Sequence, residues 1–234
     1  MIRLGRWQDV LADVECDALI CDPPYSERTH AGMRAGVSAS KRWARAGRSP
    51  DCMSARRDIA YPHWDRADMA EFVASWHARV RGWICLIVDH IEARWAEDDL
   101  AAAGRYVFAP LPLVETGRTV RLTGDGPSSW TSWLVVARPR SLSRWGTLPG
   151  AYVTPGGQRA DRHIGGKSLS MMRAIASDYS RPGDLVCDPC AGYGTTGRAA
   201  LGMGRRFAGA ECDPMTHAEA VRRLGAPVSG TLAL

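Results

Sequence analysis

The feature that most constrains this fold is a glycine-rich turn near the end of the chain. The turn, Gly192-Tyr-Gly-Thr-Thr-Gly197, lies between a predicted strand at 185–187 and a predicted helix at 196–203. Glu211 ends the next predicted strand, nineteen residues after Gly192. Glycines at these spacings let the backbone approach a ligand closely, and the acid can accept hydrogen bonds from ribose hydroxyls. This order of elements predicts a bound nucleoside cofactor, with a purely structural glycine turn as the alternative.

The turn lies too near the C-terminus to begin a whole nucleotide-binding sheet. Leu185 is about fifty residues from the end, which leaves room for two strands, so the others must come from upstream. Such an order is circularly permuted relative to dehydrogenases and disfavours a nicotinamide enzyme. Strands are predicted upstream at 17–21, 83–88, 106–114 and 132–137, and helices at 68–81, 91–103 and 169–179, with a last strand at 206–210 and helix at 214–224. The alternation predicts an α/β fold, a doubly wound and mainly parallel sheet in a single domain over 1–234.

A second motif, Asp22-Pro23-Pro24-Tyr25, directly follows the predicted strand at 17–21. It therefore lies at the carboxyl end of a strand, where open α/β sheets bind ligands. An exocyclic amine is a poor nucleophile because its lone pair is delocalised into the ring. Asp22 and the carbonyl of Pro23 can each accept one N–H bond and favour a pyramidal nitrogen, while Tyr25 offers a face for an extruded base. On its own, the motif is equally compatible with a proline turn that ends a strand.

Together the two motifs resemble the DNA amino-methyltransferases in their permuted beta-class order, in which Asp-Pro-Pro-Tyr precedes Asp188-Pro-Cys-Ala-Gly-Tyr-Gly-Thr-Thr-Gly197. Segments 5–9, 164–168 and 205–211 also resemble parts of this family. The resemblance covers most of the chain and is weakest over 26–63 and 110–162. It implies the fold of S-adenosylmethionine-dependent methyltransferases and direct methyl transfer to adenine N6 in DNA. Cytosine N4 is the alternative target, because aspartate at the first motif position leans towards adenine with exceptions.

The resemblance also implies roles for individual residues. The catalytic motif would be Asp22, Pro23, Pro24 and Tyr25. Lys167 and the helix after it would pack beside the methionine end of S-adenosyl-L-methionine. Cys190 replaces a common phenylalanine, so packing on the cofactor is expected to be looser there. The expected cofactor-binding residues are Asp22, Lys167, Asp188, Cys190, Ala191, Gly192, Gly194, Thr195, Thr196 and Glu211.

The chain's net charge of +5 is concentrated in one segment beside the catalytic motif. Between Ser26 and His63 there are eight basic and three acidic residues, a difference of five. We predict that this basic loop, 26–63, contacts DNA phosphates, although a charge run is more often a solvated face. Trp43 within it could stack on bases or pack in the core. The basic residues are Arg28, Arg34, Lys41, Arg42, Arg45, Arg48, Arg56 and Arg57.

Residues 139–162 are a small candidate target-recognition insert, with Arg138, Arg140, Arg144, Trp145 and Arg159 in or beside it. Its lack of clear periodicity predicts a loop, and its shortness predicts a short or relaxed recognition sequence. If sequencing of methylated sites showed a long and strict recognition sequence, this prediction would be wrong.

Other classes of function are less well supported. The seven cysteines are odd in number and mostly lie in apolar runs, which favours reduced, buried thiols. Cys187 and Cys190 lack two further ligands for zinc, so no metal is predicted. With no signal-like or membrane-spanning run, we expect a cytoplasmic protein of a bacterial or phage-infected cell. A ribosomal RNA amino-methyltransferase and a non-catalytic DNA-binding protein remain alternatives. A homodimer is compatible with the sequence, no nuclease partner can be inferred, and a restriction-modification role is one of several.

Overall fold

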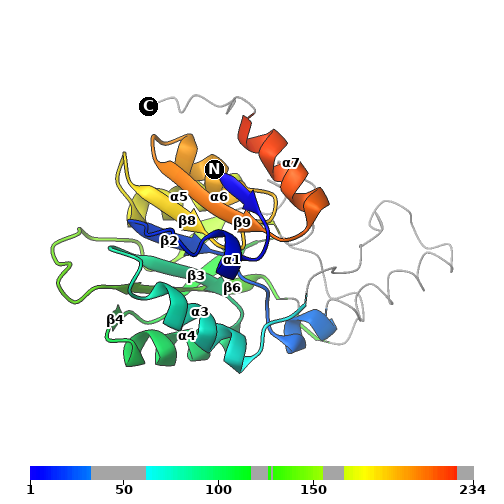
Figure 1. Ribbon diagram of the computed structural model, residues 1–234. Coiled ribbons are helices and arrows are strands. Elements are labelled where there is room, and N and C mark those ends of the chain that lie inside the picture. The colour runs from blue at the N-terminus through cyan, green and yellow to red at the C-terminus, as the bar shows by residue number, and fades with distance from the viewer. Residues whose placement is uncertain (33–61, 117–125, 128, 155–165, 226–234) are drawn as a thin grey trace, which may run out of the picture.

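The computed structural model describes residues 1–32, 62–116, 126–127, 129–154 and 166–225 (Figure 1). In the described ranges the strands are β1 (Ile2–Leu4), β2 (Ala18–Cys21), β3 (Ile84–Val88), β4 (Tyr106–Val107), β5 (Leu111–Glu115), β6 (Thr131–Arg138), β7 (Tyr152–Thr154), β8 (Leu185–Asp188) and β9 (Arg206–Glu211). The helices are α1 (Trp7–Val10), α3 (Arg66–Trp76), α4 (His90–Ala102), α5 (Leu169–Tyr179), α6 (Thr195–Leu201) and α7 (Pro214–Gly225). Residues 27–32 are also helical.

All of these strands belong to one mixed, mainly parallel sheet. Its order is β1-β9-β8-β2-β3-β6-β5-β7, and β4 pairs with β6 outside this path. The run from β1 to β3 is wholly parallel, whereas β6 is antiparallel to β3, β4 and β5. The predicted α/β class is confirmed. Strands from the N-terminal part flank β8 and β9, as the position of the glycine turn required, while the circular permutation itself stays a prediction.

Helices cover both faces of the sheet, α3 and α4 on one side and α5, α6 and α7 on the other (Figure 1). The side chains of the central strands alternate between the two layers. Leu19 and Cys21 of β2 pack with α3 and α4, whereas Ile20 between them packs with α5 and α6. Because β2 and β3 are covered on both faces, every residue in them is buried. The continuous apolar runs of the sequence follow from this double cover.

The structure adds β1, α1 and helix 27–32, which are not predicted from the sequence, the last of them inside the segment 26–63 that is predicted to be a loop. It differs from the sequence predictions in three further segments. The helix expected over 68–81 ends at Trp76, because the chain then pairs with Cys16: the Cys16 amide donates to the carbonyl of Arg79 at 3.0 Å, and the Arg81 amide donates to the carbonyl of Cys16 at 2.9 Å. The single strand expected over 106–114 is two strands, β4 and β5, separated by residues 108–110, which include a proline. The break does not follow from the proline alone, because β5 includes another proline, Pro112, opposite Trp133.

The third difference lies in segment 139–162, for which the sequence predicts a loop. It contains strand β7, parallel to β5. Trp145 packs against Trp83 and donates its indole N–H to the carbonyl of Asp178 at 2.6 Å. Trp145 is thus part of the folded body. The prediction that this segment contacts DNA now concerns its exposed arginines Arg140 and Arg144, while Arg159 lies outside the described residues.

Four of the cysteines, at 16, 21, 85 and 187, are free and buried as predicted, Cys190 is half-buried and Cys212 is exposed. Cys52 lies outside the described residues. Across the described ranges, a helix with the length and apolar character to traverse a bilayer is not found.

Gly197, the third glycine of the turn, serves packing. A Cβ at this position would lie 2.7 Å from Cε1 of Phe207 and 2.8 Å from Cδ2 of Leu224. We expect Gly197→Ala to lower the free energy of unfolding by about 1–3 kcal/mol through overpacking, measured by urea titration. Gly150→Ala is the control, because a Cβ there meets nothing within 4 Å. Equal stability of the two variants would contradict this packing role.

Candidate active site

The two sequence motifs meet at the same edge of the sheet. β2 and β8 are parallel neighbours, with Ala18 opposite Val186 and Leu19 opposite Cys187. The segment 22–25 therefore leaves the sheet beside the loop 189–194. In keeping with this short separation, the negative charge of Asp22 contributes to raising the pKa of Asp188. The two motifs are neighbours because each follows the carboxyl end of one of two paired parallel strands.

Asp22 and Tyr25 are joined by Lys167, which lies 142 residues after Tyr25 in the sequence. The ammonium Nζ lies 2.9 Å from Oδ1 and 2.8 Å from Oδ2 of Asp22, and 2.6 Å from Oη of Tyr25. The Lys167 side chain is only 3% exposed, and that of Asp22 is 26% exposed. The sequence predicts Lys167 beside the cofactor, and its direct contact with the catalytic motif could not be read from the sequence.

The residues after Tyr25 are held by Asp89, which follows β3 and caps α4. Its Oδ2 accepts hydrogen bonds from the hydroxyl of Thr29 at 2.6 Å and from both the amide and the hydroxyl of Ser26. Although burial opposes ionisation, these hydrogen bonds keep the pKa of Asp89 below its usual value. On the opposite side, the amide of Trp64 donates to the carbonyl of Tyr25 at 3.2 Å. The exit of the catalytic motif is thus fixed from two directions.

Sequence analysis missed Asp89, Glu92, Ser26 and Trp64. One signal was available, because Asp89-x-x-Glu92 directly follows the predicted strand and has the spacing of a helix capping box. Asp89 accepts from the amides of Ile91 and Glu92 at 2.9 and 3.0 Å, and Glu92 accepts from the amide of Asp89 at 3.4 Å. No comparable pattern marks Ser26 or Trp64.

Glu92 is a fully buried acid close to this site. Burial, reinforced by the negative charge of Asp89, raises the pKa of Glu92 to about 9, and Asp22 adds to the effect. Its Oε1 is buried without a hydrogen-bond partner among the described residues. Glu92 is therefore uncharged at neutral pH in the folded protein and ionised in the unfolded chain.

This difference makes stability depend on pH. Between pH 4.5 and about 9 the folded state binds more protons at Glu92 than the unfolded state, so this contribution to stability falls as pH rises. We expect Glu92→Gln to unfold at the same denaturant concentration as the wild type below pH 4. At pH 8, which is 3.5 units above the usual pKa of 4.5, the variant should be more stable by about 5 kcal/mol. A constant difference across pH would contradict the assignment.

The glycine loop after β8 is shaped by its own backbone. Gly192 and Gly194 have φ values of +49° and +74°, conformations that favour glycine. The amide of Ala191 donates to the carbonyl of Ala210 at 2.9 Å and ties the loop to β9. A Cβ added at Gly192 would meet nothing within 4 Å, so open space lies over this part of the loop.

The predicted cofactor residues divide into two groups. Asp188 and Thr196 are buried and support the loop: Oδ1 of Asp188 accepts from the amide of Cys190 at 3.1 Å. Burial raises the pKa of Asp188 to about 7, opposed by a hydrogen bond from Thr196. Ala191 and Gly194, also predicted to bind the cofactor, are buried as well. The half-buried residues are Cys190, Gly192, Thr195 and Glu211. Glu211 ends β9, one strand from the loop, and its Oε1 accepts from the amide of Asp213 at 2.8 Å.

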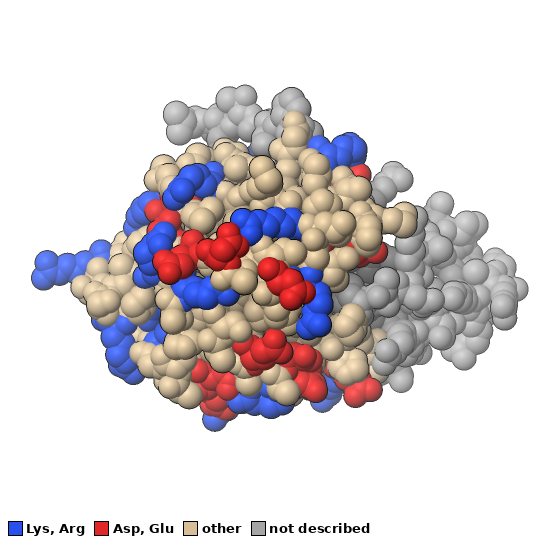
Figure 2. Space-filling view, viewed as in Figure 1, with Lys and Arg blue, Asp and Glu red and all other residues tan. Residues whose placement is uncertain are grey.

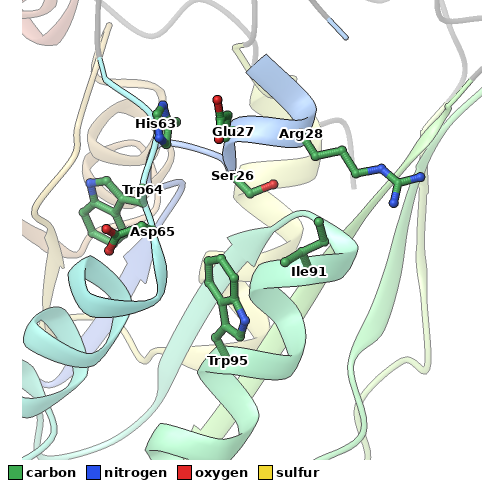
Figure 3. A pocket seen from close by; sticks show the side chains of 8 residues that line it. All are labelled: Ser26, Glu27, Arg28, His63, Trp64, Asp65, Ile91 and Trp95. Carbon is green, nitrogen blue, oxygen red and sulfur yellow. The ribbon is translucent and has the colours of Figure 1, made fainter. Parts of the chain in front are cut away.

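A pocket of about 210 Å³ lies immediately beyond the catalytic motif (Figure 3). Figure 3 shows Trp64, ahead of α3, and Trp95, on α4, on different sides of it, while Arg28 extends away from it. The pocket thus flanks the motif on the α3 and α4 side. Its lining residues are Ser26, Glu27, Arg28, His63, Trp64, Asp65, Ile91 and Trp95.

Of the predicted DNA-binding residues, the structure describes Arg28, which is exposed on helix 27–32. On the face seen in Figure 2, basic and acidic side chains are interspersed, and no broad basic surface appears among its described residues. The other predicted DNA-binding residues and Trp43 lie outside the described residues, namely Arg34, Lys41, Arg42, Arg45, Arg48, Arg56 and Arg57.

Comparisons with known proteins agree with this geometry. Residues 126–222 match a family model described as DNA methylase. M1.HpyAVI, solved with S-adenosyl-L-methionine, has a TM-score of 0.65 at 19% identity, covering 96% of this chain and 100% of that one. TTHA0409 of Thermus thermophilus, also solved with this cofactor, has a TM-score of 0.61 at 18% identity, covering 98% and 95%.

The cytosine-N4-specific PvuII DNA methyltransferase has a TM-score of 0.63 at 12% identity, covering 98% of this chain and 87% of that one. No curated protein sequence matches the chain. At these identities the likeness to the solved structures establishes the fold alone. The family model adds a sequence match over residues 126–222, in the C-terminal part of this chain.

Proposed function

We propose that this chain, an amino-methyltransferase of the DNA methylase family by its matched segment and its fold, methylates adenine N6 in DNA with S-adenosyl-L-methionine as donor. The observation that carries the proposal is the adjacency of Asp22-Pro-Pro-Tyr25 and the glycine loop 189–194 at the carboxyl ends of the paired strands β2 and β8. An amine acceptor site and a nucleoside cradle then share one edge of the sheet, as group transfer between two ligands requires.

The residues of the loop fit the cofactor. The open space over Gly192 is suited to a ligand, and a side chain at position 192 would occupy that space instead. Glu211 uses one oxygen on the amide of Asp213, and its second oxygen is suited to accept from ribose hydroxyls. S-adenosyl-L-methionine would supply an electrophilic methyl group beside Asp22. The remaining predicted contacts, from Cys190 to Thr195, line the same loop.

The catalytic motif would activate the amine by hydrogen bonding. Asp22 accepts one N–H bond and the carbonyl of Pro23 accepts the other, which draws the nitrogen towards a pyramidal geometry. Tyr25 provides the stacking surface for the extruded base. S-adenosyl-L-methionine would supply the methyl carbon and keep the electron pair of the broken sulfur–methyl bond, and the extra proton on the methylated nitrogen would then leave to water. Asp22 and Pro23 therefore act as acceptors and orienting groups, and no strong base is needed.

DNA contact is assigned to Arg28 and to the other basic residues of the loop 26–63, beside the catalytic motif. The exposed Arg140 and Arg144 are the second candidate surface. We place the protein in the cytoplasm, with DNA as its partner. A homodimer and a restriction-modification role are further predictions.

Cytosine N4 is the second candidate target. It is favoured by the fold likeness to the PvuII enzyme, which is cytosine-N4-specific. Adenine is favoured by the aspartate at the first position of the catalytic motif, Asp22. The two reactions use the same acceptors and differ in the ring that carries the amine.

The deciding experiment incubates the purified protein with unmethylated duplex DNA and S-adenosyl-L-methionine, followed by digestion to nucleosides and mass spectrometry. N6-methyladenine is the expected product. N4-methylcytosine would keep the reaction class and overturn the base, and no modified nucleoside on duplex or single-stranded DNA would overturn the DNA substrate. An RNA substrate run in parallel covers the ribosomal RNA alternative.

A further inference from the structure

Lys167 has its full hydrogen-bonding capacity engaged by the catalytic motif. A lysine ammonium has three N–H donors and no acceptor. Three acceptors lie within hydrogen-bond distance of Nζ, namely Oδ1 and Oδ2 of Asp22 at 2.9 and 2.8 Å and Oη of Tyr25 at 2.6 Å. In this arrangement no donor remains for a separate ligand. Lys167 is therefore directed at the predicted amine acceptor.

The choice of lysine is informative in this chain. Only two of its thirty cationic residues are lysines, Lys41 and Lys167, and the other twenty-eight are arginines. Arginine presents a wide planar fork, whereas lysine is a compact point charge with three donors around one atom. The three acceptors from Asp22 and Tyr25 converge on one atom, a geometry that a guanidinium cannot reproduce in the same volume. With 3% exposure, the Lys167 side chain also has little room to adopt another position.

The contact with Tyr25 is an in-line hydrogen bond and not a stacking contact. Nζ is 2.6 Å from Oη but 5.1 Å from the ring centroid. The difference is close to the distance between a phenol ring centre and its oxygen, so the ammonium lies beyond the oxygen and does not cover a ring face. Lys167 thus orients the ring without occupying the surface on which a base would stack.

A carboxylate has about four lone-pair positions, and Lys167 uses two of those of Asp22. Acceptor capacity is left for an amine, and the 26% exposure of Asp22 gives access to it. Lys167 therefore fixes the direction of the Asp22 carboxylate and leaves it able to accept a hydrogen bond from an amine.

We propose that Lys167 is a positioning residue that locks Asp22 and Tyr25 in one relative orientation, so that the amine acceptor and the stacking ring are aligned before a base enters. This rests on the proposed function of the motif. Lys167 would act on the amine only through these two side chains. Its loss would slow the transfer step and leave cofactor affinity unchanged.

The test compares the wild type with Lys167→Met, which keeps the length of the side chain and removes the ammonium. Single-turnover methylation of duplex DNA measures the transfer rate, and calorimetric titration with S-adenosyl-L-methionine measures cofactor affinity. We expect the rate to fall about 10- to 100-fold, since misaligned catalytic groups cost rates of this order, while the cofactor Kd stays within about twofold of the wild type. Lys167→Arg should restore charge but not the rate.

A double-variant cycle with Asp22→Ala tests whether Lys167 acts through Asp22. If so, adding Lys167→Met to Asp22→Ala lowers the rate much less than adding it to the wild type, because only the contact with Tyr25 is then left to lose. Thermal unfolding is followed for each variant, since removing one partner of a buried ion pair is destabilising. Should Lys167→Met not fold, Lys167→Arg, which keeps the charge but not the convergence of three acceptors on one atom, is used for both the rate and the cofactor measurements.

Three outcomes would overturn the inference. A weakened cofactor Kd with an intact transfer rate would make Lys167 a cofactor ligand, fully additive rate losses in the cycle would make it independent of Asp22, and an unchanged rate in folded Lys167→Met would leave it only structural. If the wild type itself methylates no DNA, the proposed function is wrong, and this result differs from all three outcomes above.

Discussion

Replacing Asp22 with alanine should lower the methyl-transfer rate about 10²- to 10³-fold, the cost of removing one preorganised polar group from a reacting centre. Without the carboxylate the amine loses one of its two acceptors and keeps its lone pair delocalised in the ring. Lys167 also loses two of its three acceptors and keeps only Oη of Tyr25. Single-turnover assays that detect N6-methyladenine by mass spectrometry measure the rate.

Two controls separate this chemistry from damage to the fold. Asp22→Asn keeps one acceptor oxygen, so its rate should lie between those of the wild type and Asp22→Ala. Asp13→Ala removes an exposed acid that pairs with Arg3, and should leave the rate within about twofold of the wild type, because exposed ion pairs contribute little. If Asp22→Ala kept more than a tenth of the wild-type rate, the amine-acceptor role would be wrong.

Gly192→Leu should weaken cofactor binding at least 100-fold, equivalent to about 2.8 kcal/mol. The space over Gly192 is open in the structure, so a leucine fits without a clash in the protein but occupies the volume assigned to the cofactor. Calorimetric titration with S-adenosyl-L-methionine measures the loss.

The matched control is Gly104→Leu. Gly104 has a φ of +79° and open space around its Cβ position, but it follows α4, away from the glycine loop. Both variants should lose about 1–2 kcal/mol of stability from the left-handed backbone conformation. Only Gly192→Leu should lose cofactor affinity, and equal losses of affinity in both would contradict the placement of the cofactor.

The outline of the fold and the meeting of the two motifs could be predicted from sequence, because strand ends in a parallel sheet share one edge. The segments 17–21 and 185–187 consist mostly of apolar residues, and this pattern predicts β2 and β8. The helix predicted over 169–179 has the bounds of α5 in the structure. Patterns of this kind depend on residues that are close together in the sequence, so they can be recognised from the sequence alone.

The features that sequence did not reveal depend on tertiary contacts. Lys167 reaches Asp22 across 145 positions, and nothing in the surrounding residues marks that partner. The end of α3 at Trp76 is set by pairing of the next residues with Cys16, which overrides the continuing helical pattern. Strand β7 has three residues and a partner, β5, that precedes it by nearly forty positions, so no local periodicity announces it.

The pairing of β2 with strands from opposite parts of the chain also orders events during synthesis. Leu19 lies opposite Ile84 on one side and Cys187 on the other. At about 5–20 residues per second, roughly ten to thirty seconds pass between the making of β2 and that of β8. Throughout that interval one edge of the apolar strand β2 has no native partner. Unpaired strand edges and exposed apolar surface make incomplete chains prone to aggregation. The candidate site therefore cannot form on the ribosome before β8 has been made, because the loop after β8 and the strand that ends before Asp22 lie side by side in it.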